Sequence, residues 1–188
     1  MPLFTSSREK HLWIWGLIVY AAIFSTLFFG QPLARIFGNQ NIQAAIFMLG
    51  MLLVGAAILV HALWTKPSKI EIAILLGIAA VYIMFILRLG LPERSHLIEY
   101  SVLAIVIHKA VTERVGPGTH ILKPALIALT ITFLLGVFDE SMQIFLPNRV
   151  FDPVDIFFNG MAATMAIASN VALIWLRKLK HNLKSKKR

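Results

Sequence analysis

Long apolar runs alternate with short polar segments along the chain. Six of these runs come close to the length of about 20 residues that an α-helix needs to cross a membrane. Their approximate bounds are 12–30, 42–64, 70–89, 95–111, 122–146 and 153–176, separated by Pro, Gly and charged residues. The pattern predicts an all-α polytopic membrane protein, a single membrane domain over residues 1–188 with six transmembrane helices. Short loops, such as 31–41, leave no room for a separate soluble domain.

The composition agrees with this class. Hydrophobic residues make up 58% of the chain and charged residues only 14%, whereas a soluble domain carries about 25% charged residues. The net charge of +9 would suggest nucleic acid in a soluble protein, but seven of the 18 Lys and Arg residues lie in the tail at 177–188. Such a tail is typical of a topology anchor that binds anionic lipid. We therefore expect membrane lipid as a partner and no nucleic acid.

The distribution of positive charge predicts an orientation. With six spans, 14 of the 18 Lys and Arg residues fall on the side that holds both termini, and four fall on the other side. Cytoplasmic segments are enriched in Lys and Arg. We therefore expect a multi-pass protein of the cytoplasmic (inner) membrane, with its N and C termini in the cytoplasm.

Polar residues gather where this topology places the outer half of the membrane. An ionisable group at membrane depth costs at least about 2.5–3.5 kcal/mol on insertion scales, so such a cluster indicates function. The sequence places nothing comparable in the inner half, where His108 and Lys109 are expected to reach the membrane interface. The cluster comprises His96, Glu99, Tyr100, Asp139, Glu140, Gln143, Arg149, Asp152, Asp155 and Asn159.

Helical spacing brings several of these residues onto shared faces. Residues three or four apart are neighbours on a helix, which joins His96 to Tyr100 and Asp155 to Asn159. Asp139 and Glu140 are adjacent in sequence, so we expect one of them to face the site. The other would pair with an arginine, and the candidates are Arg88, Arg94 and Arg149. Arg149, in the turn between Pro147 and Pro153, is also expected to fold back over the carboxylates.

Two motifs carry a family resemblance. The segment ERSHLIEY at 93–100, followed by DESMQIFLPNRVFDPVDIFFNG at 139–160, resembles the VanZ-like family. The resemblance is strongest over 93–162, and Ala162 stands where that family usually has Gly. It implies a bacterial cell-envelope membrane protein of a family named for resistance to teicoplanin-type glycopeptide antibiotics, with no settled biochemical activity. The family's polar positions fall on His96, Tyr100, Asp139, Glu140, Gln143, Arg149, Asp155 and Asn159.

The cluster is compatible with several functions. An enzyme acting on a lipid-linked or phosphate-bearing envelope substrate would use Asp139 or Glu140 as general base with His96 as its partner. A divalent metal held by the carboxylates is one variant of this hypothesis. The candidate catalytic residues are His96, Glu99, Tyr100, Asp139, Glu140 and Gln143, and the candidate substrate-binding residues are Arg94, Arg149, Asp152, Asp155 and Asn159.

Two further classes stay open beside the enzyme. A non-enzymatic binder would hold a lipid headgroup, a lipid-linked cell-wall precursor or a glycopeptide antibiotic in the same cluster. A purely structural network would use the polar groups to pack helices together. A proton-coupled transporter would also need polar groups in the inner half of the membrane.

Overall fold

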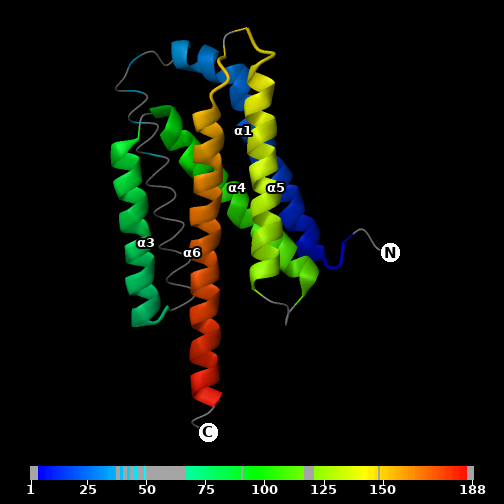
Figure 1. Ribbon diagram of the computed structural model, residues 1–188, viewed down its shortest axis with the longest axis vertical. Helices are drawn as coiled ribbons and strands as arrows, with labels where there is room; N and C mark the ends of the chain where they lie inside the picture. The colour runs from blue at the N-terminus through cyan, green and yellow to red at the C-terminus, as the bar shows by residue number, and fades with distance from the viewer. Residues whose placement is uncertain are drawn as a thin grey trace.

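The computed structural model describes residues 4–36, 67–89, 91–116, 121–147 and 149–185, and the single positions 39, 42, 45 and 49. Within these residues the chain is helical and contains no strand, which confirms the predicted all-α class. The helices, shown in Figure 1, are α1 (Ser7–Ile36), α3 (Lys69–Arg88), α4 (Leu91–Val115), α5 (Leu122–Gln143) and α6 (Pro153–Ser185).

The predicted number of six spans is not supported by the described residues. They contain five helices, of which four (α1, α3, α5 and α6) are long and apolar enough to cross a membrane. The fifth, α4, coincides with the predicted span at 95–111 but carries polar and ionisable groups along its length. The predicted span at 42–64 lies outside the described residues, apart from the single positions within it. The helices are those of a multi-pass membrane protein.

The segment 31–41, predicted as a loop, is helical as far as Ile36. A proline inside a helix has no N–H to donate to the carbonyl four residues earlier, so it can bend a helix without ending it. Pro32 lies in the last two turns of α1, and Figure 1 shows α1 changing direction near its C-terminal end. The loop prediction was therefore wrong for residues 31–36, and most of 37–41 lies outside the described residues.

α1, α3 and α5 run in one direction, and α4 and α6 run in the opposite direction (Figure 1). α4 packs against α1, α5 and α6, and α5 also packs against α6. The starts of α1, α3 and α5 lie at the same end as the C-terminal parts of α4 and α6 (Figure 1). We call this the terminal end of the bundle, because α1 begins and α6 ends there, and the opposite end the distal end. α4 is thus enclosed on three sides by other helices.

Small side chains let α4 and α6 approach closely. On α6, Ala162 and Ala163 are fully buried and Ala166 nearly so, and they pack with Leu103 and Ala104 of α4. Small residues at such contacts are typical of membrane helices, where close van der Waals packing drives association. Ala162, at the position where the family usually has Gly, fits this contact without a gap, and its carbonyl accepts a hydrogen bond from Ser101 Oγ at 3.3 Å.

α3 lies at the edge of the described bundle. Most of its large apolar side chains are exposed, as expected for a helix that faces lipid. Two polar contacts hold it: Tyr82 Oη lies 3.0 Å from Ser101 Oγ of α4, and Arg177 Nε of α6 lies 3.3 Å from Glu71 Oε1. α3 therefore contributes little to the polar cluster, which is built by the other four helices.

Candidate functional site

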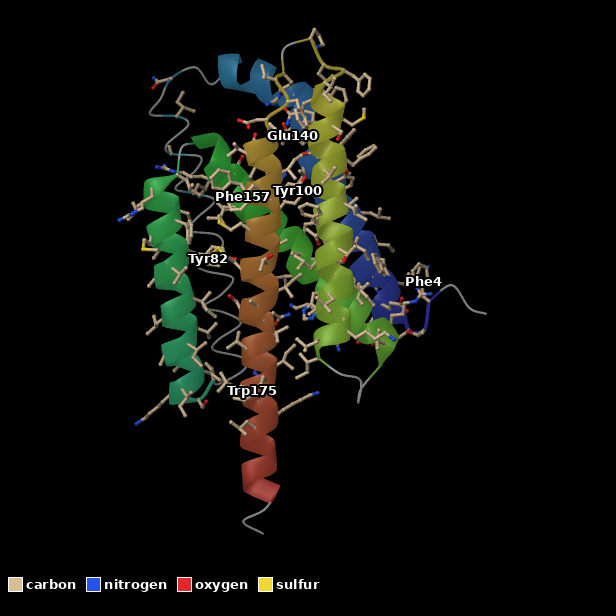
Figure 2. The ribbon with its side chains drawn as sticks, in the orientation of Figure 1. Phe4, Tyr82, Tyr100, Glu140, Phe157 and Trp175 are labelled. Carbon is tan, nitrogen blue, oxygen red and sulfur yellow. The ribbon has the colours of Figure 1, made fainter. Side chains whose placement is uncertain are left out.

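The predicted polar residues gather at the distal end of the bundle. Figure 2 shows Glu140 near this end and Tyr100 further in, both between α4, α5 and α6, while Trp175 lies toward the opposite end. His96 and Tyr100 are one helical turn apart on α4, and Asp155 and Asn159 are one turn apart on α6. The cluster therefore has two layers about 5.4 Å apart along the helices. We call them the rim layer and the deep layer.

The rim layer contains a contact between His96 of α4 and Asp155 of α6. His96 Nε2 lies 3.6 Å from Asp155 Oδ2, and the two side chains are 14% and 20% exposed. Asp155 is in the first turn of α6, where the helix dipole favours a carboxylate. Asp152 caps the same turn, because its Oδ1 accepts the N–H of Val154 at 2.8 Å, and Pro153 occupies the first helical position. The start of α6 is thus fixed where Asp155 meets His96.

Glu140 connects the end of α5 to the start of α6. Its side chain is fully buried, Oε2 accepts from Gln143 Nε2 at 2.6 Å, and Oε1 accepts the N–H of Asp152 at 2.8 Å. Both carboxylate oxygens are therefore engaged within the protein. Asp139 and Glu140 are both buried between the helices, and the expectation that one of them faces the site stays a prediction. They differ in their contacts and so in what they leave open to a ligand.

The deep layer is centred on Tyr100 and Asp139. Tyr100 Oη donates to Asp139 Oδ2 at 3.2 Å, and Tyr100, Asp139 and Asn159 are all at least 97% buried. Gly136 of α5 faces this layer. A Cβ at Gly136 would lie 3.1 Å from Asn159 Cβ and 3.2 Å from Tyr100 Cε1. Only glycine lets α5 approach α4 and α6 this closely.

Several buried polar atoms of this cluster lack a hydrogen-bond partner. In the part of the chain that the structure describes, the buried side-chain nitrogen and oxygen atoms without a partner are confined to four residues: Tyr20, His96, Asp139 and Asn159. These residues come from four different helices, and Tyr20, Tyr100 and His96 all lie within electrostatic reach of Asp139. Buried polar groups are almost always paired, so such a concentration needs an explanation. The unpaired atoms are Tyr20 Oη, His96 Nδ1, Asp139 Oδ1, and Asn159 Nδ2 and Oδ1.

The two candidate arginines, Arg149 and Arg94, donate to backbone carbonyls. Arg149 Nη2 donates to the carbonyl of Thr26 at 2.7 Å, and its Nε to that of Leu27 at 3.4 Å. Arg149 thus joins the α5–α6 turn to α1. Arg94 Nε donates to the carbonyl of Leu89 at 2.9 Å.

Arg149 also lies within electrostatic reach of Asp139. Among the described residues, however, no hydrogen bond or ion pair joins Arg149 or Arg94 to Asp139 or Glu140.

Glu99 is half-buried on α4 and lies within electrostatic reach of His96 and Asp139. The sequence also allows a divalent metal to be held by a cage of acidic and imidazole side chains. The members of that cage would be His96, Glu99, Asp139, Glu140 and Asp155. Among the described residues, no three His, Asp or Glu side chains come together in a way that could hold a metal ion. The geometry of these residues therefore gives a metal no support.

Comparison with known families identifies the chain. The family model of VanZ/LLP1 matches residues 12–176, most of the chain. The chain belongs to the VanZ/LLP1 family. Comparisons with curated proteins and with solved structures found no match. The VanZ/LLP1 match extends well beyond the motifs at 93–162 and includes α1, which supplies Tyr20 to the deep layer.

Tyr20 and Gly136 are the residues of this VanZ/LLP1 site that the sequence did not indicate. Tyr20 is a single polar side chain in the apolar run of α1, and Gly136 lies in the apolar part of α5. A tyrosine in the middle of a membrane span, away from the interfaces where tyrosines gather, was the available signal for the first. Which helix approaches Gly136 could not be read from the sequence.

The terminal half of the bundle also holds buried polar groups. His108 is 1% exposed and its Nδ1 lies 3.0 Å from Asn170 Nδ2 of α6, so the prediction that it reaches the membrane interface was wrong. Glu9 is fully buried and accepts from Thr5 N at 2.6 Å, from Trp13 Nε1 at 3.2 Å and from Arg114 at 3.2 Å. These groups have partners, in contrast to those of the deep layer.

Apolar and small side chains lie between the two polar regions of this VanZ/LLP1 protein, together with two buried hydroxyls. Between Tyr100 and His108 on α4 lie Leu103 and Ala104, which are fully buried, and between Asn159 and Asn170 on α6 lie the buried alanines of the α4–α6 contact. Ser101 of α4 and Thr132 of α5 are buried as well.

Proposed function

We propose that this VanZ/LLP1 protein is a bacterial cell-envelope membrane protein that binds the polar headgroup of a lipid-linked envelope substrate at the distal end of its bundle. The observation that carries the proposal is the set of unpaired buried atoms in the deep layer. A ligand that enters between α4, α5 and α6 would supply the partners that the protein leaves out.

The energies favour a ligand site over a packing network. A polar pair between membrane helices contributes about 0.6 kcal/mol on average. Leaving one buried polar group without a partner costs about 1–3 kcal/mol. The single hydrogen bond from Tyr100 to Asp139 cannot offset the cost of several unpaired atoms around it. A cluster that served only to pack helices would therefore be improved by replacing Asn159 with an apolar residue.

Each layer has a role in the proposal. Asp139, Tyr100 and Asn159 hold the headgroup, and the partly exposed pair of His96 and Asp155 forms the entrance above them. Glu140 keeps this entrance in shape through its bond to the Asp152 N–H. The remaining candidates are proposed to act around this centre: Glu99 and Gln143 beside the carboxylates, and Arg94, Arg149 and Asp152 at the distal end.

A second candidate function, acid–base chemistry on the bound headgroup, is favoured by the contact of His96. One ring nitrogen faces the carboxylate of Asp155, and the other, Nδ1, is buried without a partner. An imidazole held by a carboxylate on one side is well placed to exchange a proton on the other. In that case the wild-type protein and His96→Gln would both retain the bound lipid. Only cells with the wild-type protein would accumulate a chemically altered form of that lipid.

The proposal includes the orientation and the number of spans. The excess of Lys and Arg at the terminal end favours the cytoplasmic side of the inner membrane for both termini, which places the site in the outer half of the membrane. α1 ends at the distal end and α3 begins at the terminal end (Figure 1). We therefore propose a further span at 42–64, six in all, in one membrane domain. A link to teicoplanin-type resistance stays a prediction.

Lipid analysis of the purified protein tests the proposal. Wild type, Asp139→Asn and Thr164→Val are purified from bacterial membranes, and their lipids are compared with the bulk membrane by mass spectrometry. Thr164 is exposed on α6 and serves as the control. We expect one lipid class to be enriched several-fold in wild type and in the control, and less in Asp139→Asn because one acceptor is lost. A wild-type protein whose lipids match the bulk membrane would contradict the proposal.

A further inference from the structure

The unpaired atoms of the deep layer differ in their hydrogen-bonding chemistry. Asn159 Oδ1 is an acceptor, and Asp139 Oδ1 is an acceptor when its carboxyl group is ionised, while Tyr100 donates to the other oxygen of Asp139. Asn159 Nδ2 is a donor, and the hydroxyl of Tyr20 donates as well as accepts. A ligand that satisfies this set must therefore both donate and accept hydrogen bonds within a few ångströms.

Three kinds of lipid headgroup can be compared with this requirement. An ionised phosphate only accepts, so it leaves the acceptor of Asn159 without a partner. An ammonium group only donates, so it leaves Asn159 Nδ2 without a partner. A hydroxyl group does both and carries no charge. Among these groups, only hydroxyls match all of the unpaired atoms.

We infer that the deep layer binds the hydroxyl groups of a glycosyl or polyol headgroup and that the phosphate of a phosphate-bearing lipid lies outside it. This inference rests on the proposed function and names the part of the substrate that the site recognises. The rings of His96 and Tyr100 stack on α4 with their centroids 6.3 Å apart, which links the rim layer to the deep layer.

Four lipids with identical acyl chains separate these chemistries. Phosphatidylglycerol has a phosphate and hydroxyls, phosphatidylmethanol has the phosphate alone, glucosyl diacylglycerol has hydroxyls alone, and phosphatidylethanolamine has a phosphate and an ammonium group. Binding of each to the delipidated full-length protein is measured by native mass spectrometry. We expect phosphatidylglycerol and glucosyl diacylglycerol to bind at least tenfold more tightly than phosphatidylmethanol and phosphatidylethanolamine.

Substitutions assign this preference to the deep layer. Asn159→Leu keeps the branching of the side chain and removes both unpaired amide atoms, so it should bring the four lipids to similar, weak affinities. Tyr20→Phe removes one hydroxyl alone, and should reduce the preference even if Asn159→Leu fails to fold. Thr164→Val, on the exposed face of α6, is the matched control and should retain the wild-type preference.

The other outcomes each overturn the inference in a different way. Equal binding of phosphatidylglycerol and phosphatidylmethanol would show recognition of phosphate, and the proposed lipid-binding function would survive. Preference for phosphatidylethanolamine would show recognition of an ammonium group, again with the function intact. If neither the wild-type protein nor Asn159→Leu binds any of the four lipids, water is the partner of the unpaired atoms. That result would contradict the proposed lipid-binding function as well.

Discussion

The close approach at Gly136 makes a sharp prediction about packing. In Gly136→Ala, the new methyl group would lie 3.1 Å from Asn159 Cβ, 3.2 Å from Tyr100 Cε1 and 3.3 Å from Asn159 Nδ2. Tyr100 and Asn159 are at least 99% buried. Asn159 Cβ is joined directly to the backbone of α6 and cannot rotate away. The methyl group therefore has to push α5 away from α4 and α6.

The size of the effect follows from two opposing terms. Adding a methyl group to a tightly packed core costs about 1–3 kcal/mol. Replacing Gly by Ala inside a helix contributes up to about 1 kcal/mol in the other direction. Gly77 in α3 supplies the matched control, because a Cβ there would have no atom within 4 Å. The helix term is common to both variants, so their difference isolates the packing cost of about 1–3 kcal/mol.

Reversible unfolding in mixed micelles measures both variants against wild type. We expect Gly77→Ala to be as stable as wild type or more so, and Gly136→Ala to be less stable than Gly77→Ala by the packing cost. The lipid retained by wild type should also be lost from Gly136→Ala, since the methyl group separates Tyr100 from Asn159. Equal stability of the two alanine variants would refute the close contact of α5 with α4 and α6.

Two further substitutions test the distal end. The free energy of unfolding of Glu140→Gln should lie within about 1 kcal/mol of wild type, because its side-chain oxygen still accepts the Asp152 N–H. Glu140→Ala should be less stable than wild type by about 1–3 kcal/mol, because that N–H is left without a partner. Thermal unfolding compares the two variants, and equal losses of stability would argue against the hydrogen bond. Limited proteolysis should cleave the α5–α6 turn faster in Arg149→Ala than in Arg149→Lys, because the lysine still reaches the carbonyl of Thr26. Equal rates of cleavage would show that the link from the turn to α1 is not required.

The sequence was sufficient to locate the polar cluster. Helical spacing puts His96 over Tyr100 and Asp155 over Asn159, and alternating helices bring both pairs to one end of the bundle. Those inferences need only the helical period and the order of the helices. The cost of burying ionisable groups in a membrane added Asp139 and Glu140 to the cluster. That cost makes both residues unusual in an apolar span, whichever way their side chains face.

What the sequence missed depends on how helices pack. Tyr20 comes within electrostatic reach of Asp139 because α1 packs against the helices that carry the cluster, and no local pattern records that approach. Arg149 binds the carbonyls of Thr26 and Leu27 on α1, which lie 123 and 122 residues earlier in the chain. His108 was assigned to the interface by its position in the chain, but its partner Asn170 lies 62 residues later. Each case is a tertiary contact between distant segments.

The enclosed position of α4 bears on how the protein is made. α4 leaves the ribosome before α5 and α6, and its side chains include His96, Glu99, His108 and Lys109, which are poorly suited to contact with lipid tails. Two of its three covering helices do not yet exist at that moment. Stable insertion of α4 therefore depends on later segments, and the second half of the chain has to enter the membrane as a co-translational unit rather than helix by helix.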